Sequence, residues 1–145
     1  MDHQRLARVS LSTLCVIQGV AQLAIDLNRT HATNPRWTGH ARFHVVWQSI
    51  TVGLLAGIQL ILIWLRGASA NQAFYIAATL VAISPLGFLA ALLSRRFYGG
   101  QLSDLNGIPP LQVSIGRRVL SIDINVVAVV VALVILSAII LVYKN

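Results

Sequence analysis

The stretch VVAVVVALVILSAIILV, at positions 126–142, contains no charged residue, and Ser137 is its only polar residue. In water, a run this rich in Val and Ile would favour a β-strand. A lone strand in lipid leaves its backbone N–H and C=O groups without partners, whereas a helix pairs them within the segment. We therefore interpret this run as the centre of a transmembrane helix over 121–143.

Three further segments, 7–26, 43–65 and 72–94, reach or exceed the ~20 mostly apolar residues that a membrane helix needs. The connection 66–71 is short, so the second and third spans should be antiparallel neighbours. We predict an all-α fold, an integral membrane four-helix antiparallel bundle, in which residues 1–145 form a single transmembrane domain. Gly53 and Gly57 form a G-x-x-x-G pattern, so we expect their face of the second span to pack tightly, either within the bundle or between subunits.

The composition of the chain supports a membrane protein. Of the 145 residues, 57% are hydrophobic and 10% are charged, and the mean hydropathy is +0.76. A soluble domain averages about 45–50% apolar and about 25% charged residues. The net charge of +7 comes from cations beside apolar runs, where they contact lipid headgroups. These features exclude a soluble domain, a disordered chain and a coiled coil, and we expect membrane lipid as a partner and no nucleic acid.

The distribution of cations predicts the orientation of this multi-pass chain. The two long loops, 27–42 and 95–120, hold seven Lys or Arg residues, whereas the termini and the loop 66–71 hold four. Loops rich in Lys and Arg are typically cytoplasmic. We therefore expect both long loops to lie in the cytoplasm.

Polar residues form stripes along two predicted spans. On the first span, Gln18, Gln22 and Asp26 are spaced i, i+4, i+8. On the second, polar residues fall within an arc of about 100° on a helix of 3.6 residues per turn; they are His40, His44, Gln48, Thr51 and Gln59.

Such side chains are costly in lipid and usually face the interior of a bundle. Asp123 and Asn125 begin the fourth span on the same side of the membrane as the histidines. The stripes therefore predict one inward-facing cluster, consisting of Asp26, His31, His40, His44, Gln48, Asp123 and Asn125.

His40 and His44 are the strongest candidates for chemistry in this cluster. Their i, i+4 spacing directs both imidazoles to one spot, which suits two metal ligands or an acid–base pair. His31 is a candidate third metal ligand, and Asp26 or Asp123 would complete a four-ligand site. The candidate catalytic residues are His40, His44, Asp26, Gln48, Asp123 and Asn125. The alternative interpretation is that these groups satisfy one another and hold the bundle together.

The segment before the second span carries a longer motif, H-x-x-N-P-x-W-x-x-H-A-R-F-H. It is formed by His31, Asn34, Pro35, Trp37 and the residues 40–44. The motif resembles that of an uncharacterised family of small four-span membrane proteins. This resemblance implies the four-span layout but no function.

Gly39, Ala41, Arg42 and His44 also match a G-x-A-R-x-H string. In this respect the chain is similar to styrene oxide isomerase, a small four-span membrane enzyme that carries ferric haem b. The resemblance implies that His44 is the axial haem ligand. The ferric iron would act as a Lewis acid on an epoxide oxygen, and a 1,2-shift would give a carbonyl product.

The chain departs from that family six residues after the ligand, where Ile50 replaces an asparagine. Gln48 or Asn125 could supply the missing hydrogen-bond donor, and Tyr98 could lie near the site.

Two function hypotheses follow. The first is a membrane-embedded enzyme, most simply an isomerase similar to epoxide isomerases, which acts on a small lipophilic substrate. It would use haem b or another metal at His44, or else cofactor-free acid–base chemistry in which Asp26 sets the tautomer of a histidine. The small bundle favours a homo-oligomer. The second hypothesis is a non-catalytic membrane subunit or lipid-binding protein whose polar cluster is structural.

Overall fold

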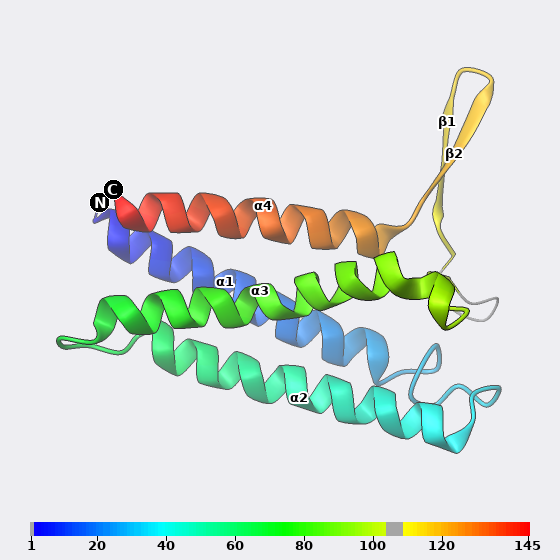
Figure 1. Cartoon of the computed structure of the whole chain (residues 1–145), viewed down its shortest axis with the longest axis horizontal. Coiled ribbons are helices and arrows are strands. Elements are labelled where there is room, and N and C mark those ends of the chain that lie inside the picture. The colour runs from blue at the N-terminus through cyan, green and yellow to red at the C-terminus, as the bar shows by residue number, and fades with distance from the viewer. Residues whose placement is uncertain (1, 104–108) are drawn as a thin grey trace.

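Four long helices make up most of the structure, a computed structural model that describes residues 2–103 and 109–145 (Figure 1). They are α1 (His3–Asp26), α2 (Gly39–Ile63), α3 (Ala70–Ser94) and α4 (Ile124–Lys144). All four are long and apolar enough to cross a membrane. The predicted all-α fold with four spans is therefore confirmed.

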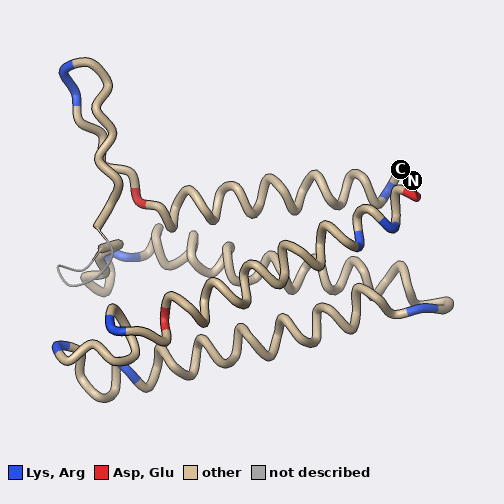
Figure 2. Tube along the Cα trace, turned by 180° about the vertical axis from the view of Figure 1, so that it is seen from behind, with Lys and Arg blue, Asp and Glu red and all other residues tan. Residues whose placement is uncertain are grey.

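The helices form an antiparallel bundle. Successive helices run in opposite directions, and the two termini lie together at one end (Figure 1). α1 packs against α2 and α4, and α3 packs against the same two helices. Charged residues gather at the two ends of the bundle, as Figure 2 shows. We call the end with the chain termini the terminus end and the opposite one the loop end.

Side-chain caps set where three of the helices begin. The Asp2 side chain accepts a hydrogen bond from the Gln4 backbone N–H, and Thr38 accepts one from that of Ala41. Asp123 accepts from the first turn of α4. Capping satisfies N–H groups that have no partner within a helix. Because Thr38 is a cap, α2 begins before its apolar run and includes His40.

The apolar core occupies the half of the bundle nearest the terminus end. Its buried residues are Ala7, Leu11, Leu14, Cys15, Ile63, Phe74, Ala77, Ala78, Val81, Leu136, Ile139 and Tyr143. The rings of Phe74 and Tyr143 stack with centroids 3.6 Å apart. In the loop half, the buried residues of the described helices are only Gly19, Ser49 and Pro85. The two halves of the bundle are therefore packed very differently.

The tight contact between α1 and α2 involves Gly19. A Cβ atom at this position would lie 2.9 Å from the Cβ of Ala56. Gly53 faces Leu23, whereas a Cβ atom at Gly57 would have no neighbour within 4 Å. Within the chain, the G-x-x-x-G face therefore packs at Gly53 but not at Gly57, and the closest approach is made by Ala56, the residue before Gly57. Packing of Gly57 between subunits stays a prediction.

Gly19→Ala is expected to destabilise the folded protein by about 1–3 kcal/mol, the usual cost of overpacking. The added methyl would force α1 and α2 apart, because both Gly19 and Ala56 contribute rigid groups at the contact. Reversible unfolding in mixed micelles measures the change. Gly57→Ala is the matched control, and an equal loss in both variants would contradict the close contact.

The loop 95–120 contains secondary structure that was not predicted from the sequence. A short 3₁₀ turn, Arg95–Phe97, follows α3, and the strands β1 (Leu111–Ile115) and β2 (Arg118–Ile122) form an antiparallel hairpin. Gly116 has a φ of 60° in the two-residue connection, which is typical of a tight hairpin turn. The hairpin projects away from the bundle (Figure 1). Consequently α4 begins at Ile124 and not at the predicted residue 121.

Candidate functional site

The first turns of α2 hold a pair of histidines in direct contact. The Nε2 atoms of His40 and His44 are 3.1 Å apart, and their rings meet edge to face with centroids 4.5 Å apart. A hydrogen bond between two ring nitrogens needs one protonated and one bare nitrogen. The i, i+4 spacing thus brings the imidazoles together, as the sequence predicted.

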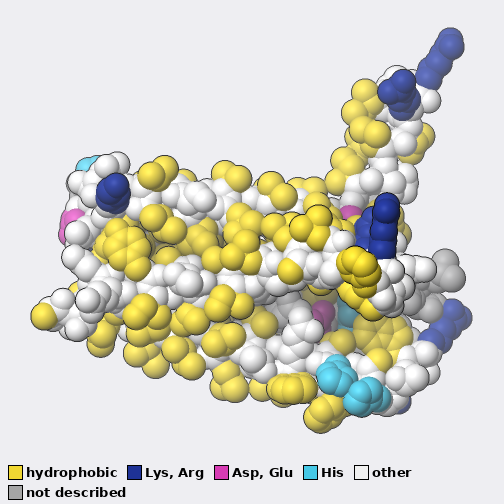
Figure 3. All heavy atoms as spheres, viewed as in Figure 1, with side chains coloured by type: hydrophobic (Ala, Val, Ile, Leu, Met, Phe, Trp, Pro, Cys, Tyr) yellow, Lys and Arg dark blue, Asp and Glu magenta, His cyan; other side chains and the backbone are white. Residues whose placement is uncertain are grey.

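The histidine pair lies on the outer surface of the bundle. His40 and His44 are exposed, as are Gln48 and Thr51 on the same stripe. Figure 3 shows histidine side chains gathered on the surface at the loop end. The prediction that this stripe faces inward is therefore wrong for these four residues.

The packing of α2 explains this orientation. The side of α2 that meets α1 carries small residues at successive turns, namely Ser49, Gly53 and Ala56. In lipid, helices associate through small residues that allow close approach. Gln59, on the flank of the stripe, is buried and its Oε1 accepts a hydrogen bond from the Cys15 thiol at 3.0 Å.

Aromatic side chains surround the histidine pair. The ring of Trp47 lies 5.8 Å from that of His44, and the ring of Phe43 lies 6.1 Å from it. Phe43 is 63% exposed and Trp47 is 59% exposed. We call His40, Phe43, His44 and Trp47 the histidine face. It is an amphipathic surface, with two polar nitrogens set among apolar rings.

Asp26 belongs to a different cluster, between α1 and α2. Its Oδ2 accepts a hydrogen bond from the Gln22 amide, and the Ser49 hydroxyl lies 3.2 Å from the same oxygen. Ser49 is fully buried and was not among the predicted site residues. Its position on the small-residue side of α2 is the signal that could have identified it. Among the described residues, Asp26 forms no contact with either histidine of the face.

Asp123 and Asn125 are also separate from the histidine face. The Oδ1 of Asp123 accepts from the backbone N–H groups of Asn125 and Val126, at 2.8 and 3.3 Å. α4 packs on α1 and α3, on the opposite diagonal from α2. The expected convergence of these residues with His40 and His44 is thus wrong within one chain. Their observed role is to cap and begin α4.

His31 lies in a compact turn that leads into α2. Its Nδ1 is 2.7 Å from the Thr30 hydroxyl, and its ring meets that of Trp37 edge to face at 5.2 Å. Asn34 is 2% exposed, and its side chain bonds the backbone of Thr30 and Arg36. The conspicuous H-x-x-N-P-x-W string therefore builds the loop.

No three His, Cys, Asp or Glu side chains within residues 2–103 and 109–145 are placed to share a metal ion. The predicted metal set of His31, His40 and His44 is therefore not assembled in a single chain. Tyr98, which could have lain near the site, donates its hydroxyl proton to the Ala91 carbonyl at 2.8 Å.

The chain has an all-α fold. Its four long apolar helices are compatible with an integral multi-pass membrane protein. Comparison of the chain with protein-family models, with curated proteins and with solved structures gives no match.

Proposed function

We propose that the protein is a membrane-embedded enzyme that isomerises a small lipophilic substrate, such as an epoxide, at the histidine face. The observation that carries this proposal is the pair of Nε2 atoms 3.1 Å apart on an exposed surface. Ionisable side chains within a membrane span are costly and are commonly functional, and they normally face a bundle interior or a water-filled cavity, so the proposal requires that the histidine face be covered in the assembled protein. A substrate dissolved in the bilayer would reach this surface without crossing water.

The donor set favours haem over a metal ion held by the protein alone. Catalytic zinc sites usually have three protein ligands, whereas a haem iron can be held by a single histidine. His44 lies deeper in the span than His40, completes the A-R-x-H string and is flanked by Phe43 and Trp47. His44 would hold haem b through its imidazole, with Nε2 released from its contact with His40. Ferric haem would supply Lewis acidity toward the oxygen of an epoxide.

Acid–base chemistry without a cofactor is the other version of the proposal. The bare ring nitrogen accepts a proton from the substrate, and the N–H of the neighbouring ring returns one. This exchange leaves the number of protons on the pair unchanged, as an isomerisation requires. Because His40 and His44 contact each other, each ring would set the tautomer of the other, in place of Asp26.

The proposal includes a homo-oligomer. The histidine face is open on the surface of one chain, and its aromatic rings are more than half exposed. A second copy packed there would enclose the histidines and exclude water from the reaction. It would also supply the polar groups that the single chain does not bring to the face.

A non-catalytic subunit or lipid-binding protein is the second candidate. It is favoured by the structural roles of the other predicted site residues. Asp26 joins α1 to α2, Asp123 caps α4 and Asn34 organises a loop. No buried side-chain N or O atom among the described residues lacks a partner.

The test uses the full-length protein, purified in neutral detergent from cells supplied with a haem precursor. We expect a Soret band and conversion of styrene oxide to a carbonyl product, measured by chromatography. Product without a Soret band would support the acid–base version. Folded protein that shows neither would overturn the proposal and favour the non-catalytic role. Micelles containing free haemin are the control.

A further inference from the structure

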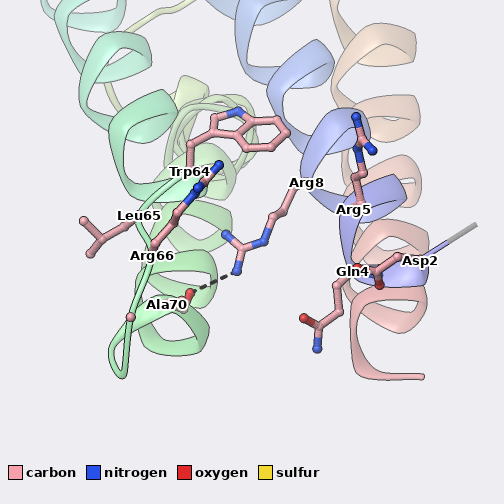
Figure 4. A pocket seen from close by; sticks show the side chains of 9 residues that line it. Asp2, Gln4, Arg5, Arg8, Trp64, Leu65, Arg66 and Ala70 are labelled. Carbon is pink, nitrogen blue, oxygen red and sulfur yellow. Dashed lines mark hydrogen bonds between the residues drawn. The ribbon is translucent and has the colours of Figure 1, made fainter.

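A hollow of ≈ 620 Å³ opens at the terminus end, at the opposite end of α2 from the histidine face. Its walls come from the first turns of α1, the end of α2 and the start of α3. Arg5, Arg8 and Arg66 line it, with Trp64 and Ala70 (Figure 4). The site is independent of the histidine face and of the proposed function.

The hollow carries a strong excess of positive charge. Three arginines line it against a single carboxylate, that of Asp2, which is engaged in capping the Gln4 backbone N–H at 3.0 Å. Arg5 and Arg66 form no hydrogen bond or ion pair with the residues that the structure describes. Their guanidinium groups are therefore available to an anion.

Arg8 is held in a fixed position at the base of the hollow. Its guanidinium donates to the Ile63 carbonyl, to the Ala70 carbonyl at 3.5 Å and to the Tyr143 hydroxyl at 2.9 Å. The Ile63 carbonyl is at the C-terminus of α2, which bears partial negative charge. This contact offsets part of the Arg8 charge and leaves Arg5 and Arg66 as the principal anion-binding groups.

The start of α3 adds partial positive charge but no free donor at Ala70, because the Ala70 N–H donates to the Gly67 carbonyl at 3.1 Å and the Ala70 carbonyl accepts from Arg8. Ala70 opens this helix on the wall of the hollow, and the side chain of Ser69, its N-cap, makes no capping hydrogen bond. Backbone N–H groups at a helix N-terminus favour anions.

Trp64 favours a location of the hollow at the membrane interface. The side chain is 47% exposed, and its indole N–H donates to the Ser12 hydroxyl at 3.0 Å. Tryptophan is enriched where lipid headgroups meet water. Guanidinium groups bind phosphate oxygens in a two-pronged geometry. We propose that this hollow binds a phosphate group, carried either by the headgroup of an anionic phospholipid or by a soluble phosphate compound.

The test follows the fluorescence of Trp64 in the full chain, with Trp37→Phe and Trp47→Phe removing the other indoles. The protein in neutral detergent is titrated with dioctanoyl phosphatidylglycerol, with dioctanoyl phosphatidylcholine and with inorganic phosphate at constant ionic strength. Near a membrane surface each basic residue changes affinity about fivefold. The double variant Arg5→Gln/Arg66→Gln should therefore bind about 25-fold more weakly. Lys144→Gln, at the same end but outside the hollow, should bind as the parent does.

Saturable binding of phosphatidylglycerol that is lost in the double variant supports a lipid headgroup as the source of the phosphate. Saturable binding of inorganic phosphate with the same loss supports a soluble compound. Equal affinity for the two lipids without phosphate binding, or equal binding by parent and double variant, would overturn the proposal. If the double variant does not fold, Arg66→Gln alone makes the comparison, because Arg66 is exposed in the connection between α2 and α3.

Discussion

His44→Ala is expected to lower epoxide conversion by at least about 100-fold, the scale on which a positioned acid or base acts. In the haem version, the purified variant should also lose its Soret band, because the imidazole is the proposed protein ligand to iron. Chromatographic product assays and absorption spectra measure the two effects. His3→Ala is the matched control, since His3 is an exposed histidine at the opposite end of the bundle.

His40→Ala separates the two versions of the mechanism. If His44 alone holds haem, the His40 variant should keep its Soret band and lose only part of the activity. If the two rings exchange protons with the substrate, both variants should lose activity to a similar extent. His44→Ala with full activity and a native fold would remove the histidine face from consideration as the site.

Arg8→Met is expected to reduce the free energy of unfolding by about 3 kcal/mol. Hydrogen bonds to charged groups contribute about 1.5–3 kcal/mol each, and a partner left unsatisfied adds to the loss. Arg8 bonds the end of α2, the start of α3 and the Tyr143 hydroxyl of α4. Its Cζ also lies 5.4 Å from the centre of the Tyr143 ring. One side chain of α1 thus joins all four helices, and unfolding in mixed micelles measures its contribution.

Two further variants test whether the contacts of Arg8 cause the expected loss of stability. Arg8→Lys keeps the charge but loses the planar fork, so it should recover only part of the stability. Arg5→Met removes a neighbouring exposed arginine and should change the stability little. If Arg8→Met were as stable as Arg5→Met, the contacts of Arg8 would not hold the bundle together.

The sequence predicted the helices well, because lipid leaves a long apolar segment few alternatives to a helix. Helical periodicity also predicted that His40 and His44 share a face. It could not indicate which face of α2 meets another helix. That choice depends on the complementary surface of α1, where Gly19 accepts the close approach of Ala56.

Contacts between segments that are distant in the chain could not be predicted from the sequence either. Arg8 was one of several cations beside an apolar run, yet its partners lie 55 to 135 positions away. The hairpin was overlooked for a different reason. The alternation of Leu111, Val113 and Ile115 before Gly116 is a local strand signal, but it stands next to a much stronger apolar run.

The concentration of the core in the terminus half has a consequence for how this chain can evolve. Most mutations in a packed core destabilise a protein, and selection removes those that fall below the stability threshold. Here the packed residues lie in the terminus half of the bundle, and the histidine face lies on α2 at the loop end. Substitutions around the histidine face should therefore have little effect on the stability that the core supplies. A lineage of such proteins can vary the surface at the loop end while it keeps an unchanged core at the terminus end.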